Sequence, residues 1–189
     1  MMKLKHDIFF PLDNNCYLII DEKTNESALI DCSQADDKMK KLIGDTDLKY
    51  IILTHGHFDH IGGVEEIRKE YKAKVAISKE DAPMLDSPPD ILISDGDVIH
   101  LGSLEIKAIS TPGHTKGGMC YIVENRLFTG DTLFKLSCGR TDFAEGDEHE
   151  MLSSLRKLKA LDKDYYIYPG HGEFSSLDFE RKNNPYMNM

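Results

Sequence analysis

Short apolar runs alternate with turn-forming residues through the first third of the chain. β-branched and aromatic residues fill the runs, and Pro, Asp and Asn occupy the separators, a pattern typical of short strands. We expect strands over residues 8–10, 16–20 and 28–31. Ser33 is a candidate N-cap for a helix over residues 34–43, which Gly44 would end.

The rest of the chain repeats this alternation of strands and helices. A run over residues 50–53 predicts a buried strand, and Val64, Ile67 and Tyr71 recur at helical spacing within a helix expected over 62–71. Further along, we expect a strand over residues 75–77 and a loop or single helical turn over 81–89. Two hairpins follow, formed by 98–101 with 104–109 and by 119–123 with 127–129. The chain then continues with a helix over 148–161 capped by Asp147, a strand over 165–168 and a helical segment over 179–183.

The two hairpins decide between the fold classes that this pattern allows. Strands joined by a tight hairpin are antiparallel, so an all-parallel Rossmann sheet is the less suitable arrangement. Two mixed sheets packed face to face, each covered by helices on its outer side, would bury these elements. We therefore predict an α/β fold, a four-layer αββα sandwich, formed as one domain over residues 1–189.

Composition and charge limit the partners. The chain is 40% hydrophobic and 30% charged, as in ordinary globular proteins. It contains no apolar stretch near the roughly 20 residues of a membrane helix and no signal peptide, so we expect a cytoplasmic protein without a membrane partner. A formal net charge of −10 argues against nucleic acid. The four cysteines form no C-x-x-C pair and are expected as free thiols, and the oligomeric state stays open.

The strongest chemical signal is the run Thr-His-Gly-His-Phe-Asp-His over residues 54–60. Five of its seven residues could bind metal or move protons, and it directly follows the buried strand expected over 50–53. The carboxyl ends of strands are where open α/β sheets commonly place ligands. Imidazole and carboxylate groups suit zinc, iron or manganese. The run therefore predicts a metal site.

Three later loops each add one ligand-type residue. His114, Asp131 and His171 each follow an expected strand, and each is directly preceded by a glycine. A glycine lets the backbone approach a site closely or adopt unusual φ values. Because this arrangement recurs three times, we expect the three residues to join the 54–60 run in one metal centre.

These motifs resemble those of the metallo-β-lactamase superfamily of metal-dependent hydrolases. The resemblance rests on H-x-H-x-D-H (55–60), T-P-G-H-T (111–115), T-G-D (129–131) and P-G-H-G (169–172), and it covers nearly all of the chain. It implies an αββα sandwich that holds two divalent metal ions. It also implies a ligand set, in which the first metal is held by His55, His57 and His114, the second by Asp59, His60 and His171, and both by a bridging Asp131.

All of these ligands are nitrogen or oxygen donors, so zinc, iron and manganese all fit, and zinc is the metal that we expect. A hydroxide that bridges two dications would be available near neutral pH as the nucleophile, with Asp59 orienting it and the first metal polarising the acyl oxygen. A thioester suits this chemistry because a thiolate leaves readily, the thiol pKa being about 8.5.

Within the superfamily, the chain is similar to small glyoxalase II-type (hydroxyacylglutathione hydrolase-like) thioesterases over residues 137–143 and 180–186. This similarity implies a small-molecule thioester substrate. Two departures leave the acyl group and the thiol carrier open: the chain stops soon after residues 184–185, where those enzymes add a helical domain, and Arg140 stands where they usually have lysine. Arg140 is our candidate for binding a substrate carboxylate, and a salt bridge with Asp142 or Glu145 is the alternative.

Two other functions compete with hydrolysis. A persulfide dioxygenase, with one iron on the same fold, shares the Cys-Gly-Arg-Thr-Asp-Phe stretch over residues 138–143, but the retained His171 favours two metals. A non-catalytic metal-binding protein would be expected to have lost a ligand, and none is missing. Hydrolysis is therefore the preferred interpretation.

Overall fold

Two six-stranded mixed sheets face each other in the computed structural model, which describes residues 1–189. The first sheet contains, in spatial order, β1 (Met2–Phe9), β2 (Asn14–Asp21), β3 (Glu26–Ile30), β4 (Asp47–Ile52), β5 (Lys74–Ser78) and β6 (Ile91–Ile93). The second contains β14 (Ser175–Ser176), β13 (Tyr166–Pro169), β10 (Arg126–Gly130), β9 (Met119–Val123), β8 (Leu104–Ser110) and β7 (Val98–Leu101). A small hairpin, β11 (Leu133–Phe134) with β12 (Ser137–Cys138), lies apart from both.

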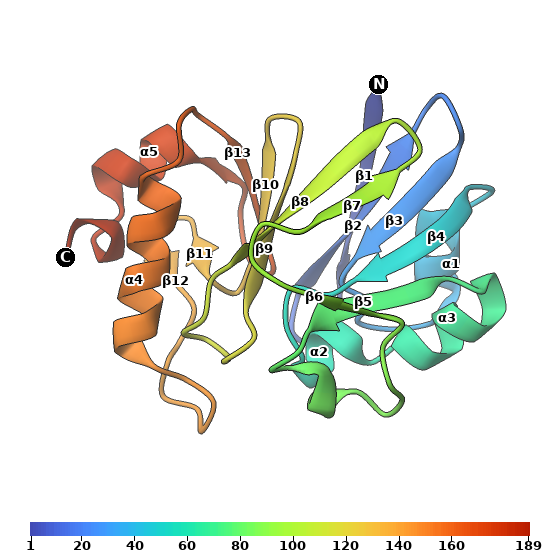
Figure 1. Ribbon diagram of the computed structural model, residues 1–189, viewed down its shortest axis with the longest axis horizontal. Helices are drawn as coiled ribbons and strands as arrows, with labels where there is room; N and C mark the ends of the chain where they lie inside the picture. Colours follow the sequence, from blue (N-terminus) through green and yellow to red (C-terminus); the bar gives the residue numbers. More distant parts are fainter.

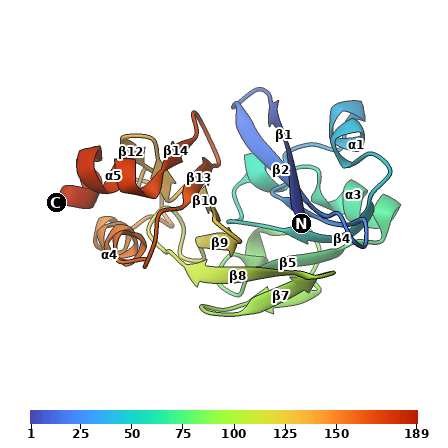
Figure 2. The ribbon, with the colours of Figure 1, turned by 90° about the horizontal axis from the view of Figure 1, so that it is seen from above.

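Helices cover the outer face of each sheet, which confirms the predicted αββα sandwich (Figures 1 and 2). The first sheet is covered by α1 (Asp37–Ile43), α2 (Phe58–Ile61) and α3 (Val64–Tyr71), and the second by α4 (Glu148–Lys159) and α5 (Leu177–Asn183). Two 3₁₀ turns, at Ala82–Met84 and Tyr186–Asn188, complete the structure. No helix combines the length and the apolar composition that crossing a membrane requires.

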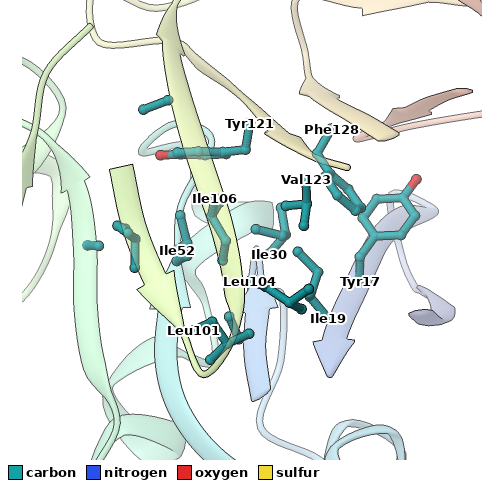
Figure 3. Packing of buried hydrophobic residues seen from close by; sticks show 14 of the residues in the cluster. Tyr17, Ile19, Ile30, Ile52, Leu101, Leu104, Ile106, Tyr121, Val123 and Phe128 are labelled. Carbon is teal, nitrogen blue, oxygen red and sulfur yellow. The ribbon is translucent and has the colours of Figure 1, made fainter. Parts of the chain in front are cut away.

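The main core lies between the sheets, where side chains from both inner faces interdigitate (Figure 3). Strand β2 shows why its sequence lacks polar alternation. Tyr17 and Ile19 point into the core between the sheets, whereas Leu18 and Ile20 pack under the helices of the first sheet. A strand buried on both faces needs apolar residues at every position, so its run is continuous.

Several boundaries differ from the sequence prediction. Helix α1 begins at Asp37 with Asp36 as its N-cap, so the prediction of Ser33 as the cap was wrong; Ser33 instead donates a hydrogen bond to Asn14 Oδ1 at 2.7 Å. The predicted helix over 62–71 is α3, which begins at Val64, and a separate short helix, α2, precedes it within the histidine-rich loop. The break falls at Gly63, where a Cβ would lie 2.3 Å from the carbonyl of Gln34, so only glycine allows this close approach.

Strand boundaries were also missed where the apolar signal is weak. Strand β1 runs back to Met2, since it pairs with β2 along its whole length, although charged or polar residues occupy four of its eight positions. Strands β6, β11, β12 and β14 were not predicted, because each has only two or three residues. The hairpins and the Asp147 cap of α4 are confirmed, and the second hairpin turns at residues 124–125.

The topology brings the four motif loops to one end of the sandwich. The loops follow the carboxyl ends of β4, β8, β10 and β13, and β10 and β13 pair in parallel, so their loops leave the same edge. Hydrogen bonds tie the two sheets together there, including Tyr121 Oη to the Leu53 carbonyl at 2.7 Å and Asn15 N to the Gly170 carbonyl at 2.7 Å. The site is therefore held by the meeting of the two sheets.

Candidate metal centre

The seven residues predicted as ligands all meet at this end of the sandwich. Their donor atoms form groups in which every member lies within 4.8 Å of the others. The first triad consists of His55, His57 and His114, and the second triad of Asp59, His60 and His171. Asp131 lies between the triads, with Oδ2 3.4 Å from His114 Nε2 and 3.5 Å from His171 Nε2, and Oδ1 3.5 Å from His60 Nε2.

One buried carboxylate, Asp31, fixes both ends of the histidine-rich loop. It accepts hydrogen bonds from the backbone N–H and the hydroxyl of Thr54, both at 2.8 Å, and from His60 Nδ1 at 2.8 Å. Sequence reasoning assigned Asp31 only to the end of a strand. One signal in the sequence could have identified it. Asp31 is an acidic residue directly after the buried apolar run of β3, just as the histidine-rich loop directly follows the next strand, β4.

The hydrogen bonds of the imidazoles also define which nitrogen faces the centre. Thr54 donates its one hydroxyl proton to Asp31, so it accepts from His55 Nδ1 at 3.1 Å, and His55 Nε2 is left as a lone-pair donor. His114 Nδ1 donates to the backbone carbonyl of Arg140 at 2.8 Å, and His171 Nδ1 donates to that of Leu12 at 2.9 Å. In each of these rings, Nε2 faces the centre free of a backbone partner.

The donor set fits a divalent cation. Two buried polar atoms, His55 Nε2 and Asp131 Oδ1, have no hydrogen-bond partner. His57 Nδ1 lies 2.9 Å from His114 Nε2, so nitrogens of these two rings meet at the same point. Unpaired buried acceptors are costly, and a cation bound between them would remove that cost. These residues would hold a metal ion as nitrogen and oxygen ligands.

Glycines make this convergence possible, as the sequence predicted. Gly113 and Gly130 have positive φ angles of 139° and 46°, a region that other residues rarely adopt. A Cβ on Gly170 would lie 2.3 Å from Asp131 Oδ1. Only glycine therefore lets this loop pass beside the centre.

A second buried carboxylate, Asp81, joins the two loops that carry the first triad. It accepts hydrogen bonds from Gly56 N at 3.0 Å, Thr115 Oγ1 at 2.7 Å and Gly117 N at 2.8 Å. Sequence reasoning missed it, because Asp81 lies in an ordinary charged loop that contains none of the recognised motifs. It also missed Asn14, whose amide nitrogen lies 2.8 Å from His60 Nε2.

Arg140 lies in the wall of the cavity above the centre but is already paired. Its Nε and Nη2 both donate to the carboxylate of Asp142 at 2.6 Å, and its guanidinium stacks on the ring of Phe143 at 4.2 Å. The ion pair is the alternative that the sequence left open. The backbone of Arg140 has a separate role, since its carbonyl orients His114.

The two triads differ in electrostatics. Burial lowers the pKa of His55 well below its usual value and lowers that of His57. Burial also acts on His60, but the negative charges of Asp31 and Asp131 outweigh it and raise the pKa of His60 to about 9. Burial would raise the pKa of Asp59, but its hydrogen bond with His171 and the charge of His60 lower it to about 2. His55 and His57 are therefore neutral at pH 7, whereas His60 and Asp59 carry charges.

This difference predicts that acidification releases metal from the second triad first. A metal ion can bind His60 only after its proton leaves, and below about pH 9 that proton is present, so the apparent affinity should fall about tenfold per pH unit. His55 and His57 have lowered pKa values and hold no competing proton near pH 7. Zinc titrations against a chromophoric chelator at pH 8 and pH 6 should show a weakening of roughly 100-fold or more at one site and a smaller weakening at the other. Equal weakening at both sites would contradict this account.

Comparisons with known proteins give the chain its family context. The family model described as the metallo-beta-lactamase superfamily matches residues 10–171. A hydroxyacylglutathione hydrolase of Pelagibacter ubique is 41% identical over 162 residues, which cover 84% of this chain and 66% of that protein. A probable polyketide biosynthesis zinc-dependent hydrolase, BaeB, of Bacillus velezensis is 34% identical over 185 residues, which cover 93% of this chain and 82% of that protein.

Solved structures agree with this assignment. The BLEG-1 B3 metallo-β-lactamase superposes with a TM-score of 0.92 at 27% identity, and the alignment covers 99% of this chain and 100% of that chain. ETHE1 from Myxococcus xanthus has a TM-score of 0.89 at 31% identity, covering 97% of this chain and 84% of its own. The family match spans all seven converging residues. The chain belongs to the metallo-β-lactamase superfamily, as its motifs predicted.

Proposed function

We propose that this protein is a dinuclear metal-dependent hydrolase that cleaves thioesters in the manner of glyoxalase II. The observation that carries the proposal is the complete pair of triads sharing one carboxylate, with buried donor atoms that lack partners. The relative named hydroxyacylglutathione hydrolase supports the substrate class. We extend the proposal to a single domain over residues 1–189 that works in the cytoplasm.

The ligand assignment follows the triads. His55, His57 and His114 would hold one ion, and Asp59, His60 and His171 the other, with Asp131 reaching donors of both. We propose zinc, because all seven donors are nitrogen or oxygen and because a relative is named as a zinc-dependent hydrolase. The same donors would also accept iron or manganese.

The chain's own residues contribute orientation and charge to the reaction. When bound, divalent cations supply an activated water at neutral pH and stabilise negative charge on the acyl oxygen. Asp59, with its pKa lowered to about 2, stays ionised and can hold the attacking water by a hydrogen bond. Water adds to the acyl carbon, the carbon–sulfur bond breaks, and a carboxylic acid and a thiol form. The thiolate leaves without a proton donor, since thiols ionise near pH 8.5.

Persulfide oxidation is the second candidate, and the likeness to ETHE1 at 31% identity favours considering it. That reaction needs one iron and would leave Asp59, His60 and His171 without ligand roles. The protein retains all three in contact, with His171 Nε2 3.2 Å from Asp59 Oδ2. Hydrolysis accounts for these residues, so we prefer it.

A direct assay separates the two functions. Protein loaded with zinc or with iron is given an S-acyl thioester and, separately, a glutathione persulfide, and thiol release and oxygen consumption are followed. We expect thiol release from the thioester with either metal and no oxygen consumption. Oxygen consumption with the persulfide, without hydrolysis of any thioester, would replace this proposal by the dioxygenase.

A further inference from the structure

A cavity of about 620 Å³ opens directly above the proposed metal ligands. His57, Asp59, His114, Asp131 and His171 all line it. This volume is within the usual range of small-molecule sites, roughly 300–1,000 Å³. A substrate in this cavity would place its reacting group at the ligands and the rest of its atoms against the other walls, so those walls indicate what it carries.

Three large apolar side chains from three separate segments surround the opening. Phe58 is 73% exposed, Leu12 46% and Phe143 41%. Phe58 comes from the histidine-rich loop, Leu12 from the β1–β2 connection and Phe143 from the loop before α4. Single exposed apolar residues are ordinary, but three that converge on one cavity with ligand-type groups beneath form a binding surface for an apolar group.

Away from the proposed metal ligands, the charged side chains of the cavity wall do not favour a carboxylate. Arg140 is the only Lys or Arg in the wall, and Asp142 already occupies both donors of its planar edge. Glu145, also in the wall, adds a negative charge. A substrate carboxylate could reach only the remaining donors of Arg140, whose charge Asp142 already offsets, and it would approach the negative charges of Asp142 and Glu145. A neutral thioester meets no such repulsion.

On the premise of the proposed function, we propose that this site takes thioesters with an apolar acyl chain on a thiol that bears no carboxylate near the sulfur. The side chains of Leu12, Phe58 and Phe143 contact the acyl chain. Asp142 makes the site prefer a neutral thiol carrier, because it already pairs with Arg140. Arg140 then contributes to acidic substrates only to the extent that Asp142 releases it.

Four substrates test this proposal, formed by hexanoyl or lactoyl groups on N-acetylcysteamine, which is neutral, or on glutathione, which carries two carboxylates. We expect kcat/KM to be at least about tenfold higher for hexanoyl-N-acetylcysteamine than for lactoylglutathione, from apolar burial alone. A preference for lactoylglutathione would overturn the inference and leave the thioesterase intact. Hydrolysis of none of the four by metal-loaded protein would overturn both.

Two variants assign the preference to residues. Phe58→Ser, at an exposed position, should lower kcat/KM about fivefold for the hexanoyl substrates and change the lactoyl ones little. Asp142→Asn frees Arg140. It should raise kcat/KM for the glutathione thioesters, relative to that for the N-acetylcysteamine thioesters, by about fivefold, which is the scale of one exposed ion pair. Asp45→Asn removes an equal charge just before the start of β4, at the opposite end from the site, and is the control. An unchanged ratio in Asp142→Asn would remove Asp142 from the proposal.

Discussion

Replacement of Asp131 by alanine should abolish metal binding at both triads and lower thioester hydrolysis by at least about 100-fold. The physical reason is its position, since its two oxygens lie within 3.5 Å of donors from the first and the second triad. Loss of His55 would remove a donor from the first ion alone. Elemental analysis after loading and desalting should find close to two metals in the parent and much less than one in Asp131→Ala.

Stability measurements separate this metal role from a structural one. In the metal-free protein, the cost of burying Asp131 Oδ1 without a hydrogen-bond partner offsets its attraction to the protonated His60, so removing the carboxylate should change the melting temperature little. The parent should gain stability when zinc is added, because a ligand that binds only the folded state stabilises it, and the variant should lose that gain. A metal-free variant that melts well below the metal-free parent would mean that Asp131 supports the fold instead.

Asp59→Asn should lower kcat by about 100-fold or more with a small change in KM. The ionised carboxylate both belongs to the second triad and can orient the attacking water, and a positioned proton acceptor typically contributes about 100- to 10,000-fold. An amide of the same shape keeps the packing but loses the charge. Unchanged kinetics with two metals still bound would remove the second triad from the reaction.

Arg140→Ala should change the kinetics differently. Its loss should raise KM for a carboxylate-bearing thioester by about fivefold at most, because Asp142 already engages the exposed guanidinium, and should leave kcat nearly unchanged. A neutral thioester should be affected little. Equal losses on acidic and neutral thioesters would make Arg140 a residue that only supports its loop.

The sequence could predict the ligands because each stands in a short motif after a strand. Three histidines and an aspartate within residues 55–60 mark the site without any knowledge of the fold. The supporting carboxylates could not be found this way. Asp31 and Asp81 act on residues more than 20 positions away, through contacts that exist only once two loops are packed together.

Arg140 shows a different limit of sequence reasoning. Its side chain suggested a carboxylate site, but the contact nearest to the chemistry is made by its backbone carbonyl, which orients His114. A backbone group carries no residue-specific signal. The strands show a similar limit. A continuous apolar run such as β2 could be predicted from its own residues. The full length of the polar edge strand β1 and the three-residue β6 could not, because both depend on pairing with neighbouring strands.

The metal content of fully active protein tests the dinuclear thioesterase most directly. Metal-free protein would be titrated with zinc while thioester hydrolysis and bound metal are measured on the same samples. We predict that activity reaches its maximum only near two equivalents per chain, in line with the two triads around Asp131. Full activity with a single tightly bound iron per chain, and no further gain on adding metal, would contradict the account.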